Sequence, residues 1–133
     1  MIELWDTSAL ILATREAEAA SRLAEALAAD AVAICEPILL EYLNGARNLA
    51  EYDRFRDALG AARWLNASGA DWTRALELHR MLATTGPGHQ RSVRLVDLVI
   101  AATAERHGAP IVHVDHDYER IAALTGQAVR WIG

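Results

Sequence analysis

Short apolar runs alternate with segments of helical periodicity along the chain, and this alternation limits the possible folds more than any other feature. The runs lack the apolar–polar alternation of a strand with one wet face, so both faces of the sheet are predicted to be covered. Strands separated by helices and covered on both faces form a mostly parallel sheet in a three-layer α/β/α sandwich. The predicted strands are Ile2–Trp5, Val32–Ile34, Arg63–Leu65, Ile111–Val114 and Ala128–Ile132.

The predicted helices fill the intervals between these strands. Helix-start residues, a proline suited to a first turn and a glycine suited to a last turn mark several of their ends. The segment Thr84–Ser92 contains Gly86-Pro87-Gly88 and is predicted to be a turn. The helices are expected from Thr7 or Ser8, and over residues 18–29, 37–46, 49–59, 71–83, 93–107 and 118–124.

The chain of 133 residues is long enough for one core and too short for two ordinary domains, so one domain over residues 1–133 is expected. Apolar stretches such as Leu95–Ala104 fall short of the roughly 20 residues of a membrane span. The N-terminus lacks the basic and apolar pattern of a signal peptide. We expect a cytoplasmic protein, in agreement with its single cysteine, Cys35.

All 13 cationic side chains are arginines, and the chain contains no lysine. The usual P-loop, Schiff-base and lysine-dependent phosphoryl-transfer chemistries are therefore excluded. The net charge of −5 argues against broad electrostatic binding to nucleic acid, because such binding depends on neutralising many phosphates. Contact with RNA or DNA would have to be local, through a metal or a small arginine cluster.

Two aspartates follow predicted strands directly, Asp6 after Ile2–Trp5 and Asp115 after Ile111–Val114. Ligands of open parallel sheets bind beyond the carboxyl ends of the strands. Both residues therefore lie where a ligand crevice is expected. An aspartate at this position can instead cap the helix that follows, and the sequence leaves both roles open.

Glu41 and Asp97 are the only charged residues within apolar helical stretches, Ile38–Leu43 and Leu95–Ile100. A carboxylate there requires a cation, hydrogen bonds or a metal. Asp97 can also be a first-turn carboxylate favoured by the helix dipole, and Glu41 can emerge at a helix edge.

Together, two strand-end aspartates and two carboxylates from apolar helices can converge on one crevice. No arginine lies beside Asp6 or Glu41 in the sequence, so the group needs a compensating cation. Ligation by oxygen alone selects a hard ion such as Mg²⁺ or Mn²⁺. Asp117 can add a ligand or hydrogen-bond a metal-bound water.

Asp6-Thr7-Ser8 after the first strand, Glu41, Arg94-Leu95-Val96-Asp97 and the segment 111–118, IVHVDHDY, resemble PIN-domain ribonucleases, specifically VapC-type toxins. The resemblance covers the whole chain in order. It implies that Asp6, Glu41, Asp97 and Asp115 bind Mg²⁺ or Mn²⁺, with Asp117 as an additional acidic position. His113 is a departure, because many relatives have Thr or Ser there.

Arg91 and Arg94 precede Asp97 and can contact a substrate phosphate or pair with the acidic residues. His113 and His116 flank Asp115, but no further histidine or cysteine spacing supports a zinc site. The four tryptophans are expected in the core or at an interface rather than as platforms for bases.

The leading hypothesis is thus a metal-dependent endoribonuclease that acts as the toxin of a toxin–antitoxin pair. Two alternatives stay open: a non-catalytic module whose acidic groove receives a basic segment, and a DNA-directed structure-specific nuclease. The resemblance further implies RNA as substrate, a small antitoxin that inserts a basic segment into the acidic groove, and a homodimer.

Overall fold

A sheet of five parallel strands forms the centre of the protein, whose computed structural model describes all 133 residues. Each strand lies within a run that the sequence predicts, so the prediction of a parallel α/β sheet is confirmed, with no antiparallel member. In chain order the strands are β1 (Glu3–Trp5), β2 (Val32–Ile34), β3 (Arg63–Trp64), β4 (Ile111–His113) and β5 (Val129–Trp131).

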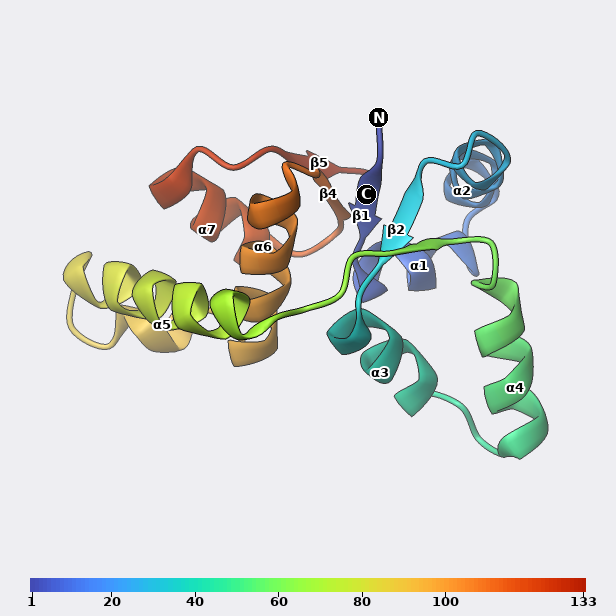
Figure 1. Ribbon diagram of the computed structural model, residues 1–133, viewed down its shortest axis with the longest axis horizontal. Coiled ribbons are helices and arrows are strands. Elements are labelled where there is room, and N and C mark those ends of the chain that lie inside the picture. Colours follow the sequence, from blue (N-terminus) through green and yellow to red (C-terminus); the bar gives the residue numbers. More distant parts are fainter.

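Helices cover both sides of this sheet, as a three-layer sandwich requires. Figure 1 shows α1 to α4 on one side and α5 to α7 on the other. The helices are α1 (Thr7–Ala13), α2 (Ala17–Ala28), α3 (Glu36–Asn44), α4 (Leu49–Ala58), α5 (Gly69–Thr84), the short 3₁₀ helix η1 (His89–Ser92), α6 (Leu95–His107) and α7 (His116–Thr125). None of these helices is long and apolar enough to cross a membrane.

The strand order β3-β2-β1-β4-β5 places the two halves of the chain on opposite sides of β1. The direction of winding therefore reverses between β1 and β4, and a crevice forms where such a reversal occurs. Trp5 pairs with Val112, and the Asp6 N–H donates to the Val112 carbonyl at 2.9 Å. The residues that follow β1 and β4 consequently lie side by side.

Two helices begin two residues earlier than the sequence patterns predict, because residues before the apolar stripe act as caps. The helix predicted over residues 71–83 begins at Gly69, where Ser68 and Asp71 form a capping box. The helix predicted over residues 118–124 begins at His116, because the Asp115 side chain accepts the Asp117 N–H.

The helix predicted from Val93 begins two residues later, at Leu95. Val93 and Arg94 have extended backbone, with Arg94 as the N-cap residue. The preceding turn contains η1, entered through Gly88 in the left-handed conformation, with φ of 76°. The conformation of this loop therefore sets the position of the Arg94 backbone at the start of α6.

The tryptophans do not share one environment. Trp5 is in the core, as predicted, whereas Trp64, Trp72 and Trp131 are exposed.

Cys35 is buried, and burial raises the pKa of its thiol to about 12. An unreactive packing role for Cys35 follows.

Candidate functional site

Asp6 and Asp115 occupy equivalent positions at the ends of neighbouring strands, and both cap the helix that follows. One Asp6 oxygen, Oδ2, accepts the Ser8 N–H at 3.0 Å and the Ser8 hydroxyl at 2.7 Å. Asp115 Oδ1 accepts the Asp117 N–H at 2.9 Å. Capping and a place in the crevice are therefore compatible, because each carboxylate retains a second oxygen.

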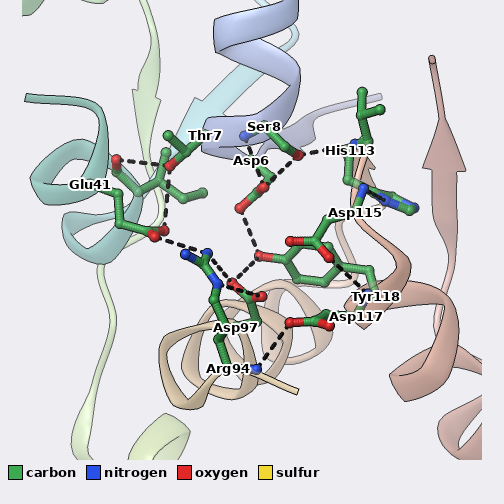
Figure 2. Close-up of polar contacts among 12 residues, drawn as sticks. Asp6, Thr7, Ser8, Glu41, Arg94, Asp97, His113, Asp115, Asp117 and Tyr118 are labelled. Atoms are coloured by element: carbon green, nitrogen blue, oxygen red, sulfur yellow. Dashed lines mark hydrogen bonds and ion pairs between the residues drawn. The ribbon is translucent and has the colours of Figure 1, made fainter. Parts of the chain in front are cut away.

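The carboxylates predicted from four separate segments converge on this crevice (Figure 2). Ligand atoms of Asp6, Glu41 and Asp97 lie within 4.8 Å of one another, as do those of Asp97, Asp115 and Asp117. Asp97 belongs to both groups. We call these five residues the acidic cluster.

The elements explain how these side chains meet. Asp97 lies in the first turn of α6 and is fully buried, while Glu41 comes from α3 and keeps part of its side chain in solvent. The Thr7 hydroxyl lies 3.4 Å from Glu41 Oε1 and 3.3 Å from the Ile38 carbonyl oxygen, and its single hydrogen can be donated to either of them. The start of α1 is thereby connected to α3 beside the cluster.

The Arg94 side chain reaches into the acidic cluster. Its Nη2 lies 2.9 Å from Glu41 Oε2 and 3.0 Å from Asp97 Oδ1. No arginine is close to Glu41 in the sequence. The fold nevertheless brings Arg94, at the start of α6, into contact with Glu41 of α3 (Figure 2). The pairing of Arg94 with acidic residues, one of two roles open from the sequence, is thus observed.

Tyr118 is a member of the site to which the sequence analysis assigns no role. Its hydroxyl is buried and lies 2.7 Å from Asp6 Oδ1 and 3.2 Å from Asp97 Oδ1. Burial raises the pKa of Tyr118 well above its ordinary value, so the hydroxyl keeps its hydrogen and donates. A polar aromatic residue close behind two acidic residues is the only sequence signal for this role.

Burial also raises the pKa of Asp97, to about 7. Arg94 opposes this effect, whereas Asp117 and Asp6 add to it. The single hydrogen of Tyr118 supplies a second reason, because it can serve only one of its two carboxylate neighbours. Asp6 lies closer, so Asp97 gains a full hydrogen bond with Tyr118 when it carries the proton itself.

Asp117 connects the cluster to the loop that carries Arg94. Its Oδ2 accepts the Arg94 N–H at 3.0 Å, and its Oδ1 lies 3.2 Å from Arg120 Nη1. Arg120, to which the sequence analysis assigns no role, is therefore a second arginine at the cluster, and on the Asp117 side of it.

Other candidates lie outside the cluster. Arg91 makes no ion pair and remains on the exposed η1 segment. His113 is buried at the end of β4, where its Nδ1 accepts the Asp115 N–H at 3.1 Å. Neither His113 nor His116 belongs to a group of converging ligands, which gives a zinc site no support.

The donor set of the acidic cluster fits a hard divalent cation. All converging atoms are carboxylate oxygens, without a thiolate or imidazole. A cationic group, the Arg94 guanidinium, lies between two of these carboxylates, which shows that the geometry accepts positive charge.

Comparisons with known proteins agree with this arrangement. The family model described as the PIN domain matches residues 4–124. Ribonuclease VapC18 of Mycobacterium tuberculosis is 41% identical over 132 residues, which cover 99% of this chain and 96% of that protein. Ribonuclease VapC51 of the same organism is 39% identical over 130 residues, which cover 97% and 91%.

Solved structures share the fold. A chain of VapBC2 from Rickettsia felis, crystallised with a DNA fragment from the promoter, has a TM-score of 0.80 at 17% identity over the whole of both chains. A chain of a toxin–antitoxin complex from Klebsiella pneumoniae has a TM-score of 0.65 at 26% identity, over 86% of this chain and 87% of that one.

Proposed function

Because this chain belongs to the PIN-domain family and, within it, to the VapC ribonucleases, we propose that it is a metal-dependent endoribonuclease, the toxin of a toxin–antitoxin pair. The observation that carries the proposal is the convergence of Asp6, Glu41, Asp97, Asp115 and Asp117 at the switch between β1 and β4. A parallel sheet provides its ligand crevice at this place.

Asp6, Glu41 and Asp97 would hold a Mg²⁺ or Mn²⁺ ion, with Asp115 and Asp117 around the same centre. When bound, such an ion supplies a water of lowered pKa and neutralises charge on the scissile phosphate. Tyr118 orients Asp6 through its 2.7 Å hydrogen bond, and Ser8 holds the other Asp6 oxygen. The proposed products carry 5′-phosphate and 3′-hydroxyl ends.

RNA cleavage with matched variants tests this activity. Cleavage should require Mg²⁺ or Mn²⁺, stop in excess EDTA, and fall at least about 100-fold in Asp97→Asn, since electrostatic groups at reacting centres contribute this much. Asp53→Asn, an exposed carboxylate of α4, is the control and should retain activity. Undiminished cleavage in EDTA or in folded Asp97→Asn would refute the proposal.

The same assay decides between the alternatives. Cleavage of branched DNA but not RNA would indicate a DNA-directed nuclease. Absence of both cleavage and calorimetric heat of Mn²⁺ binding, together with tight binding of a basic peptide, would indicate a binding module. Sequencing the 5′ ends formed after induced expression would identify the RNA.

The proposed partner is a small antitoxin whose basic segment reaches the acidic cluster. An apolar groove of about 420 Å³ lies beside the cluster, and Glu41 forms part of its wall. A segment that carries an apolar side chain for the groove and a basic side chain for the acidic cluster would be complementary to both. The other lining residues are Pro37, Leu40, Trp72, Leu95, Val96 and Val99.

Binding of an arginine-containing amphipathic peptide, measured by calorimetry, tests the groove. Leu40→Glu should weaken binding at least about tenfold, because it places a charge against apolar lining. Leu49→Glu is a matched control on another exposed leucine, outside the groove. Equal affinities of the two variants would exclude the groove as the docking site.

We further propose a homodimer located in the cytoplasm. Several large apolar side chains are exposed on the helices, among them Ile11 and Leu76, and an interface between copies would cover such surface. Sedimentation at micromolar concentration should give twice the chain's mass, and a monomer there would contradict the proposal.

A further inference from the structure

The guanidinium of Arg94 lies where the acidic cluster would otherwise need a metal. We propose that Arg94 is an internal counter-ion, which stabilises the metal-free cluster and must leave Glu41 and Asp97 before a divalent cation can bind there. This inference rests on the metal-dependent function proposed above and adds a residue that sets the metal affinity.

The distances make the two cations mutually exclusive. Nη2 of Arg94 lies within 3.0 Å of both Glu41 Oε2 and Asp97 Oδ1. A bound Mg²⁺ would lie about 2.1 Å from carboxylate oxygens of the same group. The guanidinium and the ion cannot share this space, and their like charges repel.

No other cationic side chain forms an ion pair with Glu41 or Asp97. The remaining arginine at the cluster, Arg120, contacts Asp117 instead, at 3.2 Å. Asp6 receives neutral hydrogen bonds from Ser8 and Tyr118. Removal of the Arg94 charge therefore leaves the group formed by Asp6, Glu41 and Asp97 without any counter-ion.

The Arg94 side chain can also move away from the cluster. Its side chain is 56% exposed, and its Nη1 makes no hydrogen bond or ion pair. Water already reaches the guanidinium and part of Glu41, whose side chain is 21% exposed, so solvent screens this pair and can hydrate the guanidinium when it leaves. The main chain of Arg94 stays in place, because its N–H donates to Asp117 at 3.0 Å. The released guanidinium would thus remain at the rim of the cluster, where it can pair with a phosphate of the substrate.

Mn²⁺ calorimetry on the full chain tests the exchange. Arg94→Gln should bind Mn²⁺ about tenfold more tightly than the unchanged chain, because the ion no longer displaces a charge-assisted pair. Arg91→Gln removes a charge from the same loop that touches no carboxylate, and its affinity should stay within about twofold. Millimolar methylguanidinium should weaken Mn²⁺ binding to Arg94→Gln and leave Arg91→Gln unaffected.

A second measurement separates displacement from simple repulsion between charges. In an NMR titration with Mg²⁺, the Nε–H resonance of Arg94, assigned by its loss in Arg94→Gln, should shift or broaden. Mg²⁺ binding with an unchanged resonance, or equal Mn²⁺ affinities of Arg94→Gln and the unchanged chain, would overturn the inference. Absence of metal binding in both proteins would overturn the metal-dependent function as well.

Discussion

Substitution of Asp97 by asparagine should make the metal-free protein more stable at neutral and alkaline pH, although it removes a residue of the proposed active site. Asp97 is fully buried, and its pKa is raised from 3.8 to about 7. The folded protein therefore binds this proton more tightly than the unfolded chain. Its stability falls as the pH rises from about 4 to about 7 and then levels off.

The raised pKa gives the size of this effect. The interval from 3.8 to about 7 corresponds to roughly 4 kcal/mol, since each pH unit is worth about 1.4 kcal/mol. Asparagine is neutral at every pH, and its amide will not fit every contact of a protonated carboxyl. We expect a gain of about 2 to 4 kcal/mol at pH 8, or about 8 to 16 °C in melting temperature for a chain of this size.

Urea unfolding in EDTA between pH 4 and pH 9 measures this difference directly. The curves of Asp97→Asn and of the unchanged chain should approach each other near pH 4 and separate as the pH rises to about 7. Addition of Mn²⁺ at pH 8 should stabilise the unchanged chain through preferential binding to the folded state, and the variant much less.

An opposite result would refute the reasoning. If Asp97 is merely a first-turn carboxylate of α6, Asp97→Asn would lower stability slightly at pH 8, and Mn²⁺ would stabilise both proteins equally. The first observation would show that burial does not govern the ionisation of Asp97, and the second would show that Asp97 does not contribute to metal binding.

Three further predictions concern neighbouring groups. Asp71→Asn should destabilise the folded protein by about 2 kcal/mol at pH 7, as measured by urea unfolding, and the difference should be lost toward acid pH. Burial raises the pKa of Asp71, but hydrogen bonds from Arg106, Ser68 and Thr103 outweigh this effect and lower the pKa overall. An unchanged stability of Asp71→Asn at pH 7 would contradict this pairing. Tyr118→Phe should cost about 1 to 3 kcal/mol, because it leaves a buried Asp6 oxygen without its donor, and should lower cleavage more than Mn²⁺ affinity. Cys35 should resist alkylation in the folded protein at pH 8, since its pKa is about 12, and rapid labelling would show that the site opens.

Much of the fold follows from the sequence by itself. Apolar runs separated by helical segments require a covered parallel sheet, and the five strands lie within the predicted runs. The carboxyl ends of parallel strands share one edge, so Asp6 and Asp115 could be placed together without coordinates. Glu41 and Asp97 stood out because a lone carboxylate in an apolar helix needs a partner.

The identity of that partner depended on tertiary structure. Arg94 is the N-cap residue of α6 and Asp97 follows three residues later in the first turn, so the proximity of these two residues can be inferred from their spacing in the sequence. The contact of Arg94 with Glu41, and the position of Tyr118 between Asp6 and Asp97, depend on how α3, α6 and α7 approach across the sheet end. Periodicity tells which face of each helix is buried, but it carries no information about which side chains from different helices meet there. The sequence therefore determined which carboxylates form the cluster, and only the packing of the helices decided which cation and which hydroxyl stabilise it.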